Sequence, residues 1–483
     1  MFTDFRPVDD RPVYIQVKEY LKRMITKGIL QADQKLPSTR ELSTLLHVSR
    51  NTVITAYADL EEEGLIYTVK GKGSFVSRSK IVTTSSYRLD WRQKINDKAR
   101  MAEEMDLMKH GIRWEKGMIS FTSIAPDEKL FDLSNFKRAF LDRISIEGEI
   151  LLNYGYAKGY KPLMEYLLRY MENKGVDLTG KDILITNGFT EGFDMIVSAL
   201  SRENASVICE NPTHHTAMKI LRLNGFEPVG IEMEQDGIHL EKLRRALSEQ
   251  LFCFAYLIPS YHNPTGIVMS PEKRMAVLNL FAKYQVPIIE DGFNEELRYS
   301  GSHVAPLIAC AGKGNSVIYL GSFSKILFPG IRVGWILADK DLIDYLESIK
   351  RARTIHTSTL DQAVLYQYLH NGNFEKYLKK ARSVYKRKYE LAVRCCKEFI
   401  PLKRMTGDGG LHLFIELEEN IHAREVLKDC YSKGVVFTPG DIFFTDQGGH
   451  HTLRLGFSRV SDEEMVKGIK LIGESVKKCM REV

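Results

Sequence analysis

The stretch GSFSKILFPGIR, residues 321–332, places Lys325 between hydroxyl side chains and puts Arg332 seven residues further along the chain. A lysine that sheds its proton can bond to the aldehyde of a cofactor, and nearby positive groups with partial burial favour that neutral form. Ser322, Ser324 and Arg332 are suited to hold the phosphate of the same cofactor. Taken alone, a lysine in SFSK is more often an ordinary surface charge.

Asp291 and Asn263 are candidates for contacts with the ring of such a cofactor. Asp291 ends the apolar run VPIIED, where α/β sheets usually build their sites, and a carboxylate there can keep a pyridine nitrogen protonated. Asn263 lies in PSYHNPTG, and its side-chain amide is suited to bond a ring hydroxyl. Read one at a time, Asp291 also fits a helix cap, and the segment around Asn263 also fits a simple turn.

The segment ITNGFTEGFDMI, residues 185–196, indicates a phosphate site. Its pattern predicts a strand that passes through Gly188 into a helix starting near Thr190. Free N–H groups at Gly188, Phe189 and Thr190 would then bind an anion. A lysine for an aldehyde, a carboxylate and an amide for a ring, and a phosphate cradle are together what pyridoxal 5'-phosphate needs. We therefore predict this cofactor.

The elements that must position these residues are short apolar runs that alternate with helical patterns from about residue 116 to the end. The runs besides VPIIED are DILIT at 182–186, SVIC at 206–209, FCFAYLI at 252–258 and SVIYL at 316–320. Amphipathic stretches such as EGFDMIVSAL and PEKRMAVLNLFAKY lie between them. This alternation predicts an α/β domain with a mostly parallel sheet.

Composition limits the class of protein. A chain of 483 residues with 44% hydrophobic and 27% charged residues is expected to form two or three domains with a large soluble core. No apolar run approaches the roughly 18 residues that span a bilayer, and the first residues lack the layout of a signal peptide. We expect a cytoplasmic protein with no membrane partner.

Cysteine usage and net charge add little. The seven cysteines include no CxxC spacing, so we expect neither a disulfide framework nor a metal site. A net charge of +6 is mild for this length and does not by itself indicate binding to nucleic acid. Any case for such binding must come from the pattern of residues.

The first 78 residues have the pattern of a winged helix-turn-helix. YIQVKEYLKRMITKGIL predicts a helix that stops at Gly28, and in LPSTRELSTLLHV the pair Ser38 and Glu41 predicts a capping box for a second helix. Ser49 is the expected N-cap of a third helix. The runs LIYTV, KGKG and SFV predict a two-stranded wing. The residues expected to face inward from the third helix are Val53, Ala56, Tyr57 and Leu60.

The second helix of a helix-turn-helix enters the major groove, and residues near its N-terminus meet the base edges. Arg50, Asn51 and Thr52 occupy that place, and arginine and asparagine suit paired contacts with G and A. Without the wider pattern, these residues would fit a small helical domain with a charged surface. Further candidate DNA contacts lie around the preceding helix start and on the wing: Lys35, Ser38, Thr39, Arg40, Ser49, Lys70 and Lys72.

Residues 11–77, with LPSTRELSTLLHVSRNTVITAYADLEEEGLI followed by KGKGSFV, resemble the winged-helix domain of GntR-type transcription regulators. The resemblance implies binding to double-stranded DNA. The next stretch opens with the polar SRSKIVTTSSYR and continues as a charged segment. We interpret it as a linker. The expected domains are therefore 1–78 for DNA binding, 79–115 as linker and 116–483 for the cofactor.

The order GFTEG, NPTG, strand-Asp and SFSK with a later arginine resembles the fold-type-I aminotransferases of class I/II, over roughly residues 120–478. The resemblance implies helices on both faces of the sheet and a smaller C-terminal α/β subdomain. Arg454 in TLRLGFSRV matches the family's arginine that clamps a substrate α-carboxylate; the alternative is a salt bridge on a strand.

Two positions depart from the commonest pattern of that family. His214 follows ENPT at the position that stacks on the cofactor ring, where many relatives have Tyr, Phe or Trp. Phe293 stands two residues after Asp291, where the family usually has a tyrosine whose hydroxyl bonds the ring oxygen. The resemblance therefore implies that the cofactor is bound, whereas efficient turnover stays open.

The whole layout resembles the MocR/GabR-type subfamily of GntR regulators. That resemblance implies a head-to-tail homodimer, with cofactor and effector in the large domain and an operator bound by the small domains. We expect a transcription regulator that senses an amino acid or related amine through Schiff-base exchange at Lys325. Two alternatives stay open: a working pyridoxal-phosphate-dependent aminotransferase that carries a DNA-binding domain, and a regulator that senses pyridoxal phosphate itself.

Overall fold

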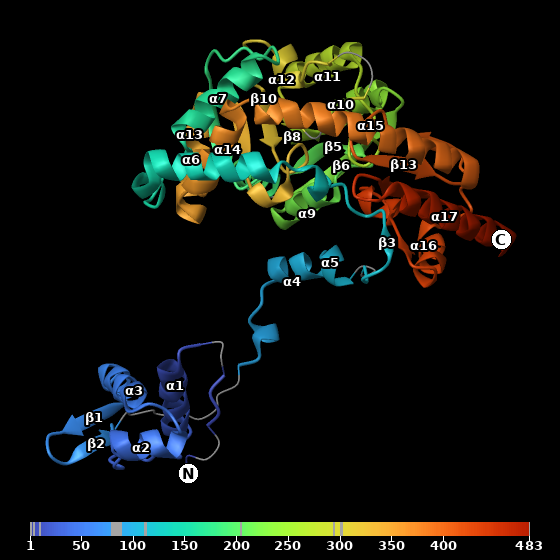
Figure 1. The fold of residues 1–483 in the computed structure, drawn as a ribbon. Helices are drawn as coiled ribbons and strands as arrows, with labels where there is room; N and C mark the ends of the chain where they lie inside the picture. The colour runs from blue at the N-terminus through green and yellow to red at the C-terminus, as the bar shows by residue number, and fades with distance from the viewer. Residues whose placement is uncertain are drawn as a thin grey trace. The chain divides into compact units, whose positions relative to one another are not determined.

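The computed structural model describes residues 2, 5–8, 11–78, 89–110, 114–202, 205–292, 295–299 and 303–482. Phe293, which we singled out in the sequence, lies outside the described residues. The chain divides into two compact units, Met1–Ile95 and Asn96–Val483, drawn in Figure 1.

The N-terminal unit is a winged helix-turn-helix, as predicted. Its helices are α1 (Val13–Thr26), α2 (Thr39–Leu46) and α3 (Arg50–Glu62), and a short 3-10 helix covers Trp91–Gln93. Strands β1 (Ile66–Val69) and β2 (Gly73–Val76) pair antiparallel to form the wing. Apolar side chains from all three helices and both strands form one core, in which the four inward-facing residues expected on α3 are buried.

The local signals that begin α2 and α3 act as the sequence predicts. The hydroxyl of Ser38 accepts a hydrogen bond from the backbone N–H of Glu41 at 3.2 Å, and the Glu41 carboxylate accepts one from the Ser38 N–H at 2.7 Å. The hydroxyl of Ser49 likewise accepts a hydrogen bond from the N–H of Thr52. These bonds satisfy N–H groups that a helix start leaves free, so both helices begin where the sequence predicts.

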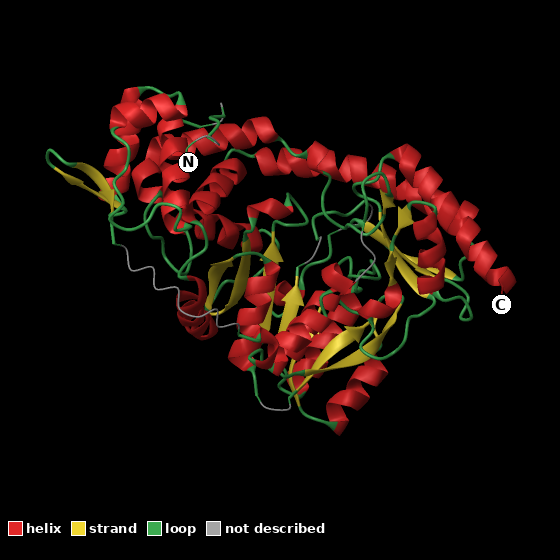
Figure 2. Cartoon of the chain, turned by 90° about the horizontal axis from the view of Figure 1, so that it is seen from below, coloured by secondary structure: helices red, strands yellow, loops and turns green. Residues whose placement is uncertain are grey.

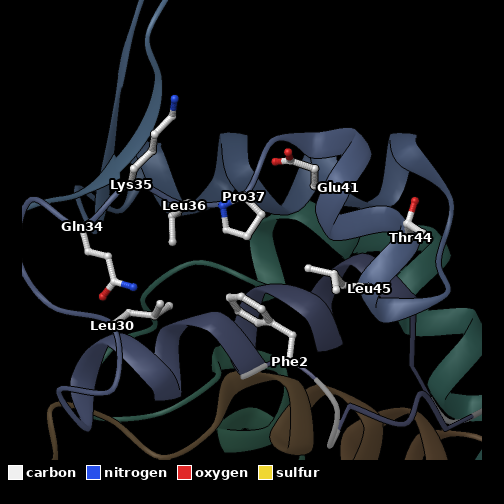
Figure 3. A pocket seen from close by; sticks show the side chains of 9 residues that line it. All are labelled: Phe2, Leu30, Gln34, Lys35, Leu36, Pro37, Glu41, Thr44 and Leu45. Atoms are coloured by element: carbon white, nitrogen blue, oxygen red, sulfur yellow. The ribbon is translucent and has the colours of Figure 1, made fainter.

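The N-terminal unit contains a cavity of about 760 Å³ between Phe2 and α2, lined by apolar and polar side chains. Figure 3 shows the ring of Phe2 pointing toward Leu30 and Leu45 at this cavity. Lys35, a predicted DNA contact, belongs to its rim, but its side chain points away from it (Figure 3). Phe2 and Phe5 thus extend the apolar core of this unit.

The larger unit begins with α4 (Asp97–Glu104) and α5 (Leu107–His110), in the segment that we expected to link the domains. Helix α4 contacts α9 (His215–Leu223), a helix that follows the second strand of the main sheet. The end of the expected linker therefore packs with the larger unit, and the chain divides between Ile95 and Asn96.

A mixed, mostly parallel sheet organises the larger unit, with the order β4-β11-β10-β9-β8-β5-β6-β7 within the described residues. Strands β6, β5, β8, β9 and β10 run parallel, whereas β11 is antiparallel to both of its neighbours. The bounds are β4 Lys181–Thr186, β5 Ser206–Asn211, β6 Glu227–Glu234, β7 Gly237–Ile238, β8 Phe252–Leu257, β9 Ile288–Asp291, β10 Val317–Ser322 and β11 Gly334–Asp339.

Helices cover both faces of this sheet, because its strands are apolar on both sides. Neighbouring residues of one strand enter different cores: Ile183 and Ile185 pack in one, and Leu184 packs in the other. Figure 2 shows the strands flanked by helices. One face carries α6 (Leu133–Leu151), α7 (Lys161–Glu172), α10 (Leu240–Glu249), α11 (Pro271–Lys283), α12 (Leu307–Cys310) and α14 (Thr359–His370); the other carries α8 (Phe189–Leu200), α9 and α13 (Lys340–Thr354).

A smaller α/β subdomain completes the larger unit, as predicted. The long helix α15 (Asn373–Phe399) joins it to the main sheet, because its first half packs in one core and its last turns in another. The remaining elements are β3 (Ile119–Ser120), β12 (Arg404–Thr406), β13 (His412–Glu416), α16 (Ala423–Ser432), β14 (Val435–Val436), β15 (Thr438–Pro439), β16 (Thr452–Gly456) and α17 (Asp462–Glu482). In the described part of the chain, every helix is too short or too polar to span a bilayer.

Candidate functional site

The ends of several strands of the main sheet open into one cavity of about 310 Å³. Strand ends of neighbouring parallel strands meet at one edge of a sheet, which is why segments far apart in the sequence converge there. The cavity brings together most of the predicted cofactor residues, namely Phe189, Thr190, His214, Asn263, Asp291, Ser322, Ser324, Lys325 and Arg332. Arg454, the predicted substrate-binding residue, lines it as well.

Asp291, the last residue of β9, is buried at the base of this cavity. The hydroxyl of Tyr256 on β8 donates a hydrogen bond to its Oδ2 at 2.8 Å. Burial raises the pKa of Asp291 to about 7, and the bond from Tyr256 opposes that rise. A positively charged ring nitrogen placed here would supply the countercharge that the buried carboxylate lacks.

Lys325 follows β10 and is the candidate nucleophile of the cavity. Burial, together with the positive charges of Arg454, Arg459 and Arg332, lowers the pKa of Lys325 to about 8. A substantial share of the amine is therefore neutral near pH 8, where it can attack a carbonyl carbon.

Gly188 and Arg332 form an anion cradle at the start of α8. Gly188 is the N-cap of that helix with φ +82°, so the helix begins at Phe189, one residue before the expected start. Arg332 donates from Nη2 to the Asn187 carbonyl at 2.7 Å and from Nη1 to the Ser324 hydroxyl at 3.4 Å. A Cβ at residue 188 would lie 2.8 Å from Arg332 Nη2, so the guanidinium requires a glycine there. Helix N–H groups and a guanidinium thus converge where a phosphate is expected.

Arg454, on β16 of the smaller subdomain, is buried and reaches the cavity. Its Nη1 donates to Oδ1 of Asn263 at 2.8 Å, and its guanidinium lies 4.8 Å from the ring centre of Phe443. Among the described residues its Nε has no hydrogen-bond partner. No carboxylate of those residues pairs with it within 4 Å, which leaves its charge to a ligand rather than to a salt bridge.

Several residues of this site escaped the sequence analysis. His215, Thr216 and Ile124 also line the cavity, and Tyr256 holds Asp291. Burial lowers the pKa of His215 to about 4 and that of His214 well below its usual value, so both rings are neutral at pH 7. The signal that could have revealed Tyr256 is a hydroxyl inside the otherwise apolar run FCFAYLI.

The residues present fit pyridoxal 5'-phosphate group by group. The Lys325 amine, with its lowered pKa, suits an aldehyde, and the buried carboxylate of Asp291 suits a ring nitrogen. Asn263 suits a ring hydroxyl, and the cradle of Arg332 suits the phosphate. In the described part of the chain, His, Cys, Asp and Glu side chains form no group that could hold a metal ion.

The predicted DNA contacts lie on the surface of the N-terminal unit. Arg50 and Asn51 are exposed at the start of α3, as are Arg40 on α2 and Lys70 and Lys72 beside the wing. Nε of Arg50 donates to the hydroxyl of Thr39 at 3.5 Å. The hydroxyls of Ser38 and Ser49 already accept hydrogen bonds in helix caps. A DNA contact would therefore use their backbone groups or the remaining bond of the hydroxyl.

Comparison with known proteins gives two family matches. Residues 119–472 match the model of aminotransferase class I and II, and residues 13–76 match that of bacterial regulatory proteins, gntR family. An uncharacterized HTH-type transcriptional regulator of Bacillus subtilis, YdfD, is 28% identical over 99% of this chain and 98% of its own. The probable rhizopine catabolism regulatory protein MocR of Rhizobium meliloti is 27% identical over 95% and 93%. The structure of a multiple substrate aminotransferase from Thermococcus profundus superposes with a TM-score of 0.78 at 28% identity, over 82% of this chain and all of that one.

Proposed function

Because this chain belongs to the class I and II aminotransferase family, whose members use pyridoxal phosphate, and carries a gntR-family DNA-binding domain, we propose that it is a transcription regulator that senses an amino acid or related amine. The observation that carries the proposal is the cavity itself. Lys325, Asp291, Arg332 and Arg454 line one space on a chain that also exposes a recognition helix.

When bound, pyridoxal phosphate supplies an aldehyde that bonds to amines and a ring that withdraws electrons from the atoms attached to that bond. Lys325 would hold the aldehyde carbon, Asp291 the ring nitrogen and Arg332 the phosphate. Arg454 would bind the effector carboxylate, since its guanidinium is buried in the same cavity. An amine that takes the place of Lys325 leaves this lysine free, with a pKa near 8 that lets it accept a proton.

Regulation requires that the effector bind two conformations of the large unit unequally. Arg454 belongs to the smaller subdomain and donates to Asn263, which follows a strand of the main sheet. A carboxylate on Arg454 would compete for that guanidinium and so act on the bond between the two subdomains. The proposed result is a changed affinity for the operator.

A homodimer is part of the same proposal. Apolar side chains on and after α6 are widely exposed, with Ile150 at 72% and Leu152 at 78%, and Tyr154 and Tyr156 follow them. An apolar face of this kind is typical of an interface with another protein surface. We propose that a second copy covers it head-to-tail, so that two DNA-binding domains act on one operator. A monomer in analytical ultracentrifugation would rule this out.

A working aminotransferase is the second candidate, favoured by the presence of all four of these side chains in the cavity. Titration of the purified protein with amino acids, followed by its visible absorption, separates the two functions. A band that shifts and stays shifted supports the sensor. A band that decays and returns with an oxo acid supports the enzyme.

The regulatory proposal itself is tested on DNA. An operator selected from random duplexes should bind the wild-type protein with an affinity that the effector changes. Lys325→Ala protein should bind the same operator without that response. If the variant responds as the wild type does, the amine is sensed elsewhere.

A further inference from the structure

The loop that presents Asn263 to the cofactor cavity presents Ser260 and Tyr261 to a different cavity, of about 210 Å³. We call it the Glu295 cavity. Its polar lining comprises Ser260, Tyr261, Glu295, Arg298, His303 and Asp408. None of these residues lines the cofactor cavity, and none has a role in the proposed function.

Glu295 gives this cavity a carboxylate that shares its cation with a second carboxylate. Its Oε2 accepts hydrogen bonds from Nζ of Lys174 at 2.6 Å and from the hydroxyl of Tyr319 at 3.2 Å. Nζ of Lys174 also donates to Oε1 of Glu296 at 2.6 Å, so one ammonium group is shared by two carboxylates. Within the described residues, Oε1 of the buried Glu295 has no hydrogen-bond partner. Such an oxygen is costly to leave without a donor, so the cavity favours a ligand that brings one.

Arg298 gives the same cavity an unmatched positive group. Its side chain is half-buried and makes no hydrogen bond or ion pair with another described residue. Asp408 lines the cavity as well, but its Oδ2 accepts from the N–H of Val268 at 3.2 Å instead of pairing with Arg298. A guanidinium that pairs with no described residue suits the two oxygens of a carboxylate.

The walls of the cavity are held by the backbone. Arg298 forms a β-bridge with Gly409, and the N–H of Gly410 donates to the Leu297 carbonyl at 3.0 Å. Tyr261 adopts a φ of +50°, and a Cβ at residue 409 would lie 2.4 Å from its ring. The ring of Tyr261 therefore depends on a glycine opposite it, and the two walls are fixed against each other.

We propose that the Glu295 cavity binds a free amino acid, with its ammonium group at Glu295 and its carboxylate at Arg298. The ammonium group of the ligand would meet a carboxylate that shares one lysine with Glu296, and the carboxylate of the ligand would meet a guanidinium that pairs with no described residue. The volume suits a small ligand, because pockets for drug-sized molecules measure roughly 300–1,000 Å³. Occupancy would act on the loop of Tyr261 and Asn263, and so couple this cavity to the cofactor cavity in both directions.

Calorimetry on full-length protein tests the proposal once the cofactor cavity is closed to amines. Borohydride reduces the carbon–nitrogen double bond between Lys325 and the cofactor to a single bond, after which no amine can exchange there. Glycine, alanine and serine titrated into this protein should bind at one site per chain. Acetate and methylamine, which carry one charged group each, should bind at least tenfold more weakly than glycine, because each loses a charge-assisted bond.

Arg298→Gln should weaken the binding of glycine at least tenfold, and Arg404→Gln, on the exposed strand β12, should leave it unchanged. The Arg298 side chain has no hydrogen-bond or ion-pair partner among the described residues, so this variant is expected to fold. Glu295→Gln provides a second variant on the opposite wall. No binding in the millimolar range, or binding that survives Arg298→Gln, would overturn the proposal. A failure of the proposed function shows separately, as the absence of a cofactor adduct on Lys325 in the mass spectrum of the reduced protein.

Discussion

The hydroxyl of Tyr256 on β8 donates to Oδ2 of Asp291 on β9 across 2.8 Å, and both side chains are buried. The two strands are parallel neighbours, so the bond links the ends of two adjacent segments of the sheet at the base of the cavity. Burial alone would favour the neutral acid, and the hydroxyl favours the charged carboxylate. Tyr256 is therefore expected to set how strongly Asp291 binds a positively charged ring.

Tyr256→Phe should lower the affinity for pyridoxal phosphate about tenfold at pH 7, because one hydrogen bond to a charged group contributes about 1.5–3 kcal/mol. Asp291 has a raised pKa of about 7, and the variant raises it further, so the carboxylate is charged only at higher pH. The loss should therefore shrink at pH 9. Absorbance titration of apoprotein at both pH values measures it. Tyr166→Phe on α7 removes another hydroxyl that donates to a carboxylate, that of Glu375 at 3.3 Å, and is the matched control because Tyr166 does not line the cofactor cavity. A loss of affinity equal at both pH values would contradict the account.

Lys325 should make the uptake of cofactor depend on pH. Its pKa is lowered to about 8. The fraction of Lys325 in the reactive neutral form therefore rises between pH 7 and 8, and nearly all of the amine is neutral well above pH 8. The rate at which apoprotein acquires its visible band should rise over that range and then level off. Arg454→Met removes one of the positive charges that lower this pKa, so the rise should move to higher pH. A rate that is flat between pH 6 and 9 would mean that the amine is not the group that titrates.

Arg332 should discriminate pyridoxal phosphate from pyridoxal. Its guanidinium lies at the start of α8, beside Gly188 and Ser324, and the proposed phosphate would bind there. Arg332→Gln should lower the affinity for pyridoxal phosphate about tenfold to a hundredfold, which corresponds to about 1.5–3 kcal/mol for a charge-assisted bond. The affinity for pyridoxal should stay unchanged. Competition between the two ligands gives the ratio directly. An equal loss for both would place the phosphate away from this cradle.

The sequence predicted those parts of the molecule that depend on short-range signals. The capping residues Ser38 and Ser49 begin α2 and α3, and the apolar runs form β4, β5, β8, β9 and β10. Gly188 was expected to precede a helix because a glycine before a helix is a local pattern, and the structure places it as the N-cap. These features are fixed by residues within a few positions of one another.

Contacts between distant segments could not be predicted from the sequence. Asn263 and Arg454 were each expected to meet a ligand, but their direct bond follows from how the smaller subdomain packs on the main sheet. His215 and Thr216 line the cavity because α9 begins there, and nothing in HHT separates a ligand-facing histidine from a buried one. The pairing of Tyr256 with Asp291 depends on strand order, which a single sequence leaves open.

Arg50 and Lys72 should affect DNA binding in different ways. Arg50 is exposed at the start of α3, where a helix-turn-helix meets base edges, so Arg50→Ala should weaken the selected operator by about 1–3 kcal/mol and relax the choice of one base pair. Lys72 lies in the turn of the wing, between β1 and β2, where it is expected to contact phosphates. Lys72→Ala should weaken all duplexes alike and reduce the dependence of affinity on salt by about one ion.

Fluorescence anisotropy with the operator and a scrambled duplex, over a range of salt concentrations, separates these two effects. Lys470→Ala on α17 changes the net charge of the protein by the same amount, but in the other unit. It should alter neither the salt dependence of DNA affinity nor the preference for the operator. If Arg50→Ala lowers the affinity for operator and scrambled duplex equally, Arg50 contacts the backbone instead of a base. The bases would then have to be read by Asn51 or Thr52, the neighbouring residues on the first turn of the same helix.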